Sequence, residues 1–510
     1  MYNTMKKYIA IFFAGLLLFT SCKDSFFDLY PTDEMTAENY MNDVDEIETV
    51  LTAAYSALRG NFGDAVMYIG DLPTDNAYDY KLNNSSGQIQ LHESNVNSQN
   101  GIIGNLWYSC YQIINRCYLV TETLDAMNTS DPRAKDIYGQ AEFLRAYAYY
   151  VMVRVWGDVP LVKEDIKDYM KVFEYGRTPK AEVYAYIIEQ LKSAAGKLPD
   201  FRAGAEKGRV TAVAANAILG DVYLTQGDYS TAKGYFKGII DKEGANLGLL
   251  DDLKSIYDSN NVNNKEIIFA IQYAHNMTPT QRNDLGRATL GNIQGVIIDP
   301  IGDGRSKIIG TSCMLMTHEL LAKFEKGDKR LALVYLGCTS PDYQCVIPMS
   351  LKYFDYQNIE DGNAGIDVDC GCHTIISRYA DILLKYAECL AQEPSGLEEA
   401  VAQVKRIRTR AGLETSIPLD KESVVNAIAA ERQRELCLEG HRWFDLVRTG
   451  KAIETMNTFY SRKNAPDLHK TILQYEYGDN TSIDAHELIY PIPYAQVELN
   501  KEKLPQNPGY

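Results

Sequence analysis

Apolar side chains recur every three or four residues along most of this chain, and that spacing restricts it to a mainly helical fold. After Thr36, with Glu38 in the expected first turn, one apolar stripe continues to Leu58 and stops at Gly60. Residues three and four apart share one face of an α-helix, so the stripe predicts a helix with one buried face. Another helix is predicted to open at Asp131-Pro132. The same spacing predicts helices near residues 102–127, 179–196, 209–226, 229–241, 374–392, 396–411 and 422–439.

One pair of predicted helices has the character of an internal repeat. The segment LGDVYLTQGDYSTAKGYF places Gly220, Tyr223, Ala232 and Phe236 at the spacings of a tetratricopeptide helix–turn–helix unit. In such a unit small residues let two helices approach, and an aromatic ring fills the remaining gap. Residues 379–412 carry a weaker version. The predicted fold class is therefore mainly α, a degenerate tetratricopeptide-like scaffold of helical pairs with an elaborated loop-rich lobe.

The loop-rich lobe is predicted in the middle of the chain. Residues 245–370 are rich in Gly, Asn and Asp, with no sustained helical period and one strand-like stretch, EIIFAIQY. That is too long for a structureless loop inside a compact domain, so we expect a lobe packed on the helices. A second loop-rich stretch is predicted at residues 61–101. The chain then divides into residues 1–21, an N-terminal helical region 22–241, the lobe 242–372 and a C-terminal helical region 373–510.

The N-terminus has the pattern of an export signal. Lys6 and Lys7 precede an apolar run of about twelve residues, which is shorter than the ~20 residues that a membrane-spanning helix needs. The run ends in Leu-Phe-Thr-Ser before Cys22, which resembles a bacterial lipobox whose cysteine is acylated. Residues 1–21 are therefore predicted to be a lipoprotein signal peptide, with Cys22 as the lipid attachment site. The alternatives are an ordinary signal with a chance cysteine, or a membrane anchor.

Charge and motif content exclude several classes of function. The formal net charge of −17 and the absence of a basic stripe argue against a nucleic-acid partner. The chain contains no G-x-S-x-G, H-E-x-x-H, P-loop or dinucleotide fingerprint, so no catalytic residue is predicted and we expect a binding protein. The 36 Tyr outnumber the 15 Phe, and an excess of rings with hydroxyl groups suits a polar ligand or helix interfaces.

The cysteines and clustered acids leave alternatives open. Cys110 and Cys117 are seven residues apart on a predicted helix, a rise of ~10 Å, beyond the ~7 Å reach of a disulfide. A second group looks like a zinc site, but its C-G-C-H spacing is not that of common zinc sites, so loop disulfides or free thiols are also possible. A structural Ca²⁺ site in the first loop region is a further possibility, although the spacing is not that of an EF-hand, and no cofactor is predicted. The second group comprises Cys338, Cys345, Cys370, Cys372 and His373, and the acids are Asp71, Asp75 and Asp79.

Six motifs together resemble the SusD/RagB family, nutrient-binding outer-membrane lipoproteins of Bacteroidetes. They occur in the family's order and run nearly from end to end of the chain. The C-terminal family domain is expected to begin near residue 266. The motifs are SCKDSFFDLYP after the lipobox, LWYSCYQIINRCYLV (106–120), AEFLRAYAYYVMVRVWGDVPLV (141–162), RYADILLKYAECL (378–390), ERQRELCLEGHRWFDLVRTG (431–450) and the ending LIYPIPYAQVELNKEKLPQNPGY (488–510).

These motifs favour structural roles over chemical ones. In ERQREL, the acids and arginines predict charge pairs along one helix. Arg442 and Asp445 are predicted to lock the following turn, and Trp443 and Phe444 to enter the core.

The resemblance implies a cell-surface lipoprotein of the outer membrane that captures oligosaccharides and delivers them to a TonB-dependent β-barrel transporter of the SusC type. Peptide capture for a peptide importer and a tetratricopeptide-like scaffold for surface protein assembly are the alternatives. Sugar binding needs flat aromatic faces together with side chains that bond hydroxyl groups. Two loop groups offer that mixture and are the candidate ligand-binding residues: Tyr78, Tyr80, Asn83 and Asn84, and Tyr343, Tyr353 and Tyr356.

Overall fold

A computed structural model describes residues 41–80, 86–278, 280–291, 310–338, 346–356, 370–464 and 475–510. Two compact units are distinguished: the structure describes residues 41–47 of the first, and residues 48–510 form the second. Helix α3 (Val44–Ser56) carries the first apolar stripe. The predicted start at Thr36 lies outside the described residues; residues 41–43 are not helical, and α3 begins at Val44. Asp43 explains this start, because its Oδ1 accepts the Glu46 backbone N–H at 2.9 Å and caps the first turn.

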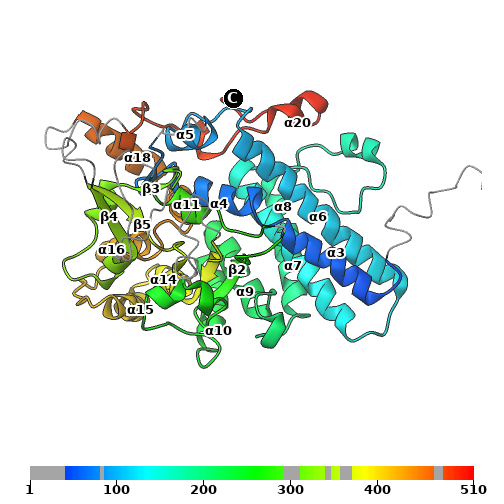
Figure 1. Ribbon diagram of the computed structural model, residues 1–510, viewed down its shortest axis with the longest axis horizontal. Helices are drawn as coiled ribbons and strands as arrows, with labels where there is room; N and C mark the ends of the chain where they lie inside the picture. The colour runs from blue at the N-terminus through cyan, green and yellow to red at the C-terminus, as the bar shows by residue number, and fades with distance from the viewer. Residues whose placement is uncertain are drawn as a thin grey trace, which may run out of the picture. The chain divides into compact units, whose positions relative to one another are not determined.

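The predicted N-terminal helices are confirmed as a series of antiparallel neighbours. Each of the helices from α6 to α10 packs on the next along the chain (Figure 1). Asn100, Thr211 and Asp228 cap α6, α9 and α10 by accepting backbone N–H bonds in the first turn. Gly157, with a φ of 73°, ends α7 and turns the chain. The bounds are α6 (Gly101–Met127), α7 (Arg133–Trp156), α8 (Lys180–Ala195), α9 (Ala212–Thr225) and α10 (Tyr229–Ile240).

The α9–α10 pair confirms the close approach that its sequence predicts. A Cβ placed on Gly220 would lie 2.5 Å from the Phe236 ring, so only glycine fits where the helices meet. Ala232 and Phe236 are fully buried. Tyr223 stacks on Tyr235, with ring centroids 5.6 Å apart. The pair is therefore held by shape and apolar contact.

The C-terminal helices share a core with this pair. Helix α10 packs on α14 (Tyr379–Leu390), which packs on α15 (Leu397–Arg410) and α16 (Lys421–Glu435). The helix predicted over 374–392 is wrong at its start, because residues 374–378 form strand β6 (Thr374–Arg378). That strand pairs antiparallel with β2 (Ile267–Ile271), and the backbone bonds to this distant partner replace those of another helical turn. Strand β2 confirms the strand expected in EIIFAIQY.

The central lobe consists of short elements around two further strand pairs. Strand β1 (Ala77–Tyr78) pairs with β3 (Leu315–Met316), and β4 (Val334–Cys338) pairs with β5 (Val346–Ser350). The loop-rich stretch predicted over 61–101 contains two helices that were not predicted, α4 (Asn61–Asp71) and α5 (Ser86–His92). Most side chains of α4 are buried, so packing stabilises this helix where local sequence signals are weak. The remaining helices are α11 (Leu285–Ala288), α12 (His318–Leu321), α17 (Arg442–Arg448), α18 (Ala452–Ser461) and α20 (Tyr494–Leu499). Single 3-10 turns occupy Tyr169–Glu174, Gly204–Glu206, Lys254–Ile256, Ser259–Asn261, Lys329–Leu333, Pro394–Gly396, Arg462–Asn464 and His486–Leu488.

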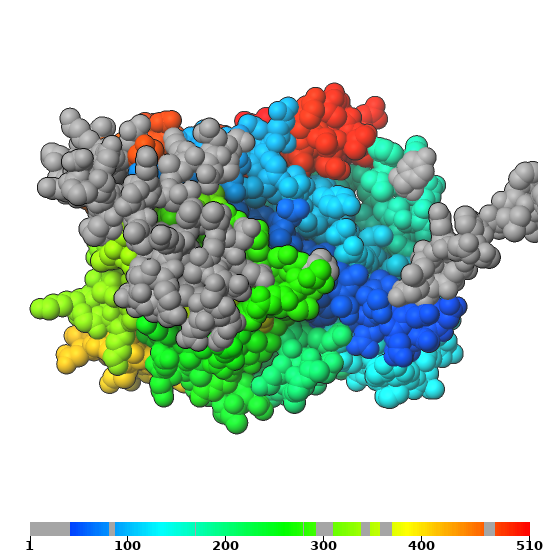
Figure 2. Space-filling view, in the orientation of Figure 1, coloured from blue at the N-terminus to red at the C-terminus, as the bar shows by residue number. Residues whose placement is uncertain are grey.

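The chain end runs along the surface of the N-terminal helices. In Figure 2 the red C-terminal segment lies beside the cyan segment of those helices. Tyr490 N donates to Val155 O at 2.8 Å, and Trp156 Nε1 donates to Pro491 O at 3.1 Å. Asn507 is buried and donates to the carbonyls of Trp156 and Tyr490. The C-terminus is thus tied to the end of α7. Across the part of the chain that the structure describes, no helix combines the length and apolarity needed to cross a membrane.

A buried cluster of ions, the Arg378 junction, joins the lobe to the C-terminal helices. The fully buried Arg378 guanidinium donates to Glu266, Glu435 and Glu439 at 2.9, 2.7 and 2.8 Å. Arg410 bonds Glu266 and Glu435, and Lys352 bonds Glu439. The charges come from β6, α15, α16, the loop between α16 and α17, and residues next to β2 and β5, so the junction fixes the relative positions of these segments.

The charge pairs predicted along ERQREL are only partly present. Arg434 does bond Glu431 one turn earlier, at 2.6 Å. Arg432 instead bonds Asp381 and Asp445 on other helices, and Glu435 belongs to the Arg378 junction. Helix α16 is buried in this part, so its charges find partners across helix interfaces and not along its own surface.

Candidate functional site

The candidate ligand-binding tyrosines fall into two groups by burial. Tyr78 and Tyr353 are only 2% and 1% exposed, and the Tyr353 hydroxyl donates to Leu438 O at 3.0 Å. Neither offers a ring face to solvent. Tyr80 and Tyr356 are half-buried and keep part of each ring accessible. Asn83, Asn84 and Tyr343 lie outside the described residues, as does the lipid attachment site Cys22.

Half-buried tyrosines gather on the lobe around one apolar centre. We call Tyr80, Tyr335, Tyr356 and Tyr475 the tyrosine cluster, because all of them pack against the same buried group of side chains from β1, β3 and β5. Tyr80 lies against Tyr475, with ring centroids 4.4 Å apart and an angle of 30° between the rings. Tyr356 meets the buried Phe354 edge-on at 4.6 Å. The buried centre comprises Tyr78, Leu290, Leu315, Ile347, Met349, Leu351 and Phe354.

Sequence reasoning found two members of the tyrosine cluster and missed two. Tyr335 lies on β4, where it pairs with Met349 of β5. The alternation in VYLGC was a weak signal for it. Tyr475 is almost four hundred residues from Tyr80, and no local pattern connects them. Only the tertiary structure brings these rings together.

The chemistry of the tyrosine cluster suits a polar ligand with apolar faces. Packing holds each ring in place, and the accessible part of a tyrosine combines an apolar ring with a polar hydroxyl group. Burial raises the pKa of Tyr356 above its usual value, so this phenol stays protonated at neutral pH and can donate a hydrogen bond. Rings held in place lose little conformational freedom when a ligand binds.

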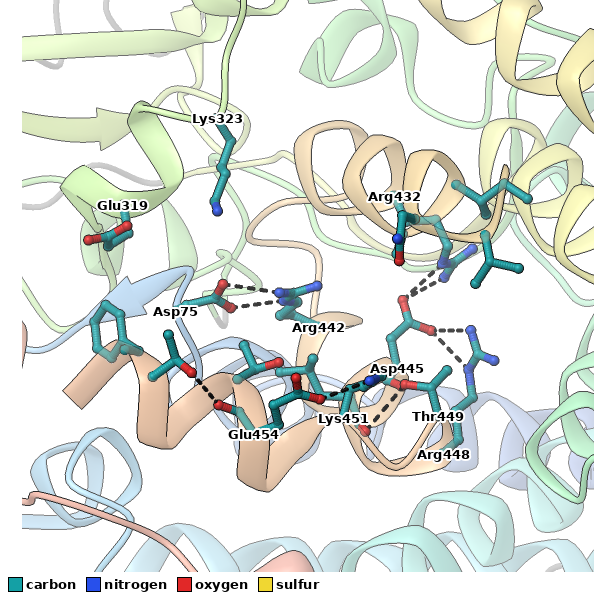
Figure 3. Close-up of a pocket in the computed structure, with 18 of the residues that line it drawn as sticks. Asp75, Glu319, Lys323, Arg432, Arg442, Asp445, Arg448, Thr449, Lys451 and Glu454 are labelled. Atoms are coloured by element: carbon teal, nitrogen blue, oxygen red, sulfur yellow. Dashed lines mark hydrogen bonds and ion pairs between the residues drawn. The ribbon is translucent and has the colours of Figure 1, made fainter. Parts of the chain in front are cut away.

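A second concavity, the charged pocket, has a volume of about 460 Å³ and is lined mainly by α16, α17 and α18 (Figure 3). Arg442 bonds Asp75 through Nε and Nη2, at 2.9 and 3.0 Å. Asp445 accepts bonds from Arg432 and Arg448. The prediction that these residues lock the following turn is confirmed for Asp445, which bonds Arg448 one turn later. It is wrong for Arg442, which bonds Asp75 instead. Lys323 points its ammonium group into the pocket (Figure 3).

Electrostatics keep the acids of the charged pocket ionised. Burial alone would raise the pKa of Asp75, but Arg442 holds it below its usual value. Burial acts the same way on Asp445, and Arg432 and Arg448 hold its pKa low. Of the two predicted core residues beside this pocket, Trp443 is buried. Phe444 is half-buried, with the Arg154 guanidinium over its ring at 4.2 Å.

The acids considered for calcium are held by protein donors. Asp71 accepts from Asn76 Nδ2 at 3.0 Å and from Gly440 N at 2.6 Å. Burial raises the pKa of Asp71 to about 6, although these two bonds act in the opposite direction. Asp75 faces Arg442, as above, and Asp79 is buried. These donors take up oxygen positions that a calcium ion would need.

Comparison with known proteins finds matches at both ends of the chain. A model described as the SusD family matches residues 339–510, and one described as starch-binding associating with outer membrane matches residues 25–224. The chain is thus similar to SusD-family proteins in both regions. A SusD-like protein P2 of Formosa agariphila is 25% identical to this chain, over 99% of this chain and all of that protein.

Solved structures share the fold of this protein. A laminarin binding SusD-like protein superposes with a TM-score of 0.73 at 24% identity, over 91% of this chain and 99% of that one. Surface glycan-binding protein A from Bacteroides thetaiotaomicron, solved in complex with laminarihexaose, gives a TM-score of 0.72 at 22% identity, over 91% and 99%. The mainly helical SusD-like fold is thereby confirmed. None of these relatives is described as an enzyme.

Proposed function

We propose that this protein captures oligosaccharides at the cell surface and passes them, unchanged, to a TonB-dependent β-barrel transporter of the SusC type. The observation that carries the proposal is the tyrosine cluster, which offers several partly exposed rings on one buried apolar support. Sugar rings stack on such faces through their C–H groups, and phenol hydroxyls bond the sugar hydroxyls. Relatives described as binding laminarin and laminarihexaose support a glycan as the ligand class.

Calorimetric titration of the purified protein with laminari- and malto-oligosaccharides tests this proposal. We expect one of these series to bind, and Tyr80→Ala or Tyr475→Ala to weaken that binding at least ~10-fold, since loss of a well-packed aromatic anchor costs ~2 kcal/mol or more. The matched control is Tyr108→Ala on α6. That ring is 68% exposed and outside the tyrosine cluster, so affinity should be unchanged. Equal affinities for all three variants would exclude the tyrosine cluster as the binding site.

Attachment to the outer membrane through Cys22 belongs to the same proposal. The family description of association with the outer membrane supports it. Cys22→Ala should move the protein from the membrane fraction to the soluble fraction, because acyl chains supply the anchoring free energy. If the variant stays with the membrane, the lipid anchor is not at Cys22. Co-purification of a β-barrel with the wild-type protein from detergent extracts tests the transporter partner.

Peptide capture is the second candidate function, and the charged pocket favours it. Its walls carry both signs of charge, and Lys323 faces the cavity (Figure 3). A peptide presents an ammonium and a carboxylate group that such walls can bind. Lys323→Ala should weaken peptide binding and leave glycan binding intact. Binding of peptides but of no glycan would replace the first proposal by this one, and a protein that binds neither would point to the scaffold alternative.

A further inference from the structure

Two buried thiols lie beside an acid and a histidine on the inner side of the central lobe. The ligand atoms of Asp355, Cys370 and Cys372 all lie within 4.8 Å of one another. His275 Nδ1 is 3.2 Å from Asp355 Oδ2. The three closest groups are buried, and His275 is half-buried. Two sulfurs and one oxygen therefore converge, and the His275 nitrogen lies beside that oxygen.

The backbone between the two cysteines is shaped for this convergence. A Cβ placed on Gly371 would lie 3.0 Å from His275 Nδ1 and 3.4 Å from Asp355 Oδ2. A larger residue would therefore push the imidazole and the carboxylate away. Gly286 has a similar role on the far side, where a Cβ would lie 3.1 Å from Cys370 Sγ. Glycines on both sides let the four groups approach.

The carboxylate is already oriented by neighbours outside the group. Ser259 Oγ donates to Asp355 Oδ1 at 2.6 Å, and Gly371 N donates to Oδ2 at 2.7 Å. Hydrogen bonds of this kind to a ligand side chain are the usual support of a metal site. They hold Asp355 in place whether or not an ion is bound.

We propose that Cys370, Cys372, Asp355 and His275 bind a structural zinc ion. Two sulfurs with one nitrogen and one oxygen form a donor set that Zn²⁺ accepts in tetrahedral geometry. On binding, each thiol loses its proton to solvent, and the two thiolates and the carboxylate together carry three negative charges against the two positive charges of the ion. The ion would tie the segment before β6 to the lobe and so stabilise the lobe.

This donor set differs from the one that the sequence suggested. His373 follows Cys372 directly, but its Nδ1 accepts the Tyr273 backbone N–H at 3.2 Å and is committed to that bond. The Cys338 side chain and Cys345 lie outside what the structure describes. His275 and Asp355 are far from C-G-C-H in sequence, so spacing alone did not reveal them.

Metal analysis of the full-length lipoprotein, extracted in detergent and purified without chelators, tests the proposal. We expect inductively coupled plasma mass spectrometry to find about one zinc ion per chain. Replacement of zinc by Co²⁺ should give a thiolate-to-cobalt charge-transfer band. Cys370→Ser and Cys372→Ser should abolish both signals. The matched control is Cys110→Ser with Cys117→Ser, two buried free thiols of α6, which should retain both.

Two milder variants keep the test valid if the cysteine variants do not fold. Ser259→Ala removes an orienting bond and should weaken Co²⁺ binding by ~10- to 100-fold. His275→Gln, at a half-buried position, should weaken it at least as much. Absence of zinc together with absence of the cobalt band would overturn the proposal, and so would a disulfide between Cys370 and Cys372 in the purified protein. Glycan binding is measured separately, so its failure leaves this result unaffected.

Discussion

The α9–α10 pair and the Arg378 junction are both buried, yet different forces hold them together. In the pair, a glycine admits a phenylalanine ring, and the contact is entirely apolar. In the junction, one guanidinium is surrounded by three carboxylates from separate segments. The pair depends on neighbours within twenty residues of each other, whereas Glu266 and Glu439 are more than 170 residues apart.

This difference indicates where the fold tolerates substitution and where it does not. A packed apolar interface loses stability in proportion to the atoms removed or crowded. A buried ionic cluster has already lost the hydration of every charge, so each charge depends on its partners. Loss of Arg378 from the junction therefore leaves three buried carboxylates with fewer cationic partners.

The largest effect is expected from Arg378→Met. The new side chain has similar length, but Glu266, Glu435 and Glu439 lose a shared cation inside the core. We expect a loss of ~3–5 kcal/mol in the free energy of unfolding, measured by urea titration. The control is Lys451→Ala, whose ion pair with Glu454 is exposed, and it should cost only ~0–1 kcal/mol. Similar losses for both variants would mean that the junction contributes no more than a surface pair.

A smaller effect is expected when the apolar pair is crowded. Gly220→Ala places a methyl group against the Phe236 ring and should cost ~1–3 kcal/mol in the free energy of unfolding. Gly234→Ala on α10 is the matched control. No atom lies within 4 Å of a Cβ there, so the substitution should stabilise the helix by ~0.5–1 kcal/mol. A gain at both positions would show that α9 and α10 are not in close contact at Gly220.

The smallest effect, on the order of 1 kcal/mol per pH unit, has opposite signs in the Arg378 junction and on helix α4. In the junction, burial opposes ionisation of Glu439, but Arg378 and Lys352 lower its pKa from 4.5 to about 2. Its contribution to stability is present above pH 4.5 and is lost as the pH falls to about 2. On α4, burial raises the pKa of Asp64 from 3.8 to about 7, and Asp284 adds to the rise. Stability from this group is lost as the pH rises from about 4 to about 7.

The variant Asp64→Asn isolates the contribution of Asp64 to the pH dependence of stability. It should match the wild type near pH 4 and exceed it in stability at pH 8, as followed by thermal melting across the pH range. Asp241→Asn, at an exposed pair with Lys237, is the control and should leave the pH dependence unchanged. A wild-type profile that is flat between pH 4 and pH 7 would contradict the assignment of Asp64.

Local patterns predicted the helices well, and they failed where a distant partner decided the outcome. The helices from α6 to α10 follow local helical spacing, and Asn100, Thr211 and Asp228 cap three of them, so their ranges could be anticipated closely. Residues 374–378 were assigned to a helix, because nothing within them shows that β2 is available for pairing. Arg442 was expected to lock the turn that follows it, but its partner Asp75 is 367 residues away in the sequence.

The candidate site shows the same division between what local sequence patterns predict and what distant contacts decide. Tyrosines in loop-rich segments were reasonable candidates for binding, yet burial removes Tyr78 and Tyr353 from the surface and leaves Tyr80 and Tyr356 partly exposed. Tyr475 joined the tyrosine cluster without any sequence signal. Exposure depends on what covers a side chain, and for these rings the covering residues come from elsewhere in the chain.

The sequence by itself determined the helical repeat, the acidic character and the resemblance to the SusD family, because each depends on neighbouring residues or on the order of motifs. The tertiary structure alone decided which tyrosines share a surface, which arginine meets which carboxylate, and that Asp355 and His275 stand beside Cys370 and Cys372. The physical reason is the separation along the chain over which each interaction acts. Backbone preferences and periodicity act over a few residues, whereas burial and ion pairing depend on contacts between segments that are hundreds of residues apart.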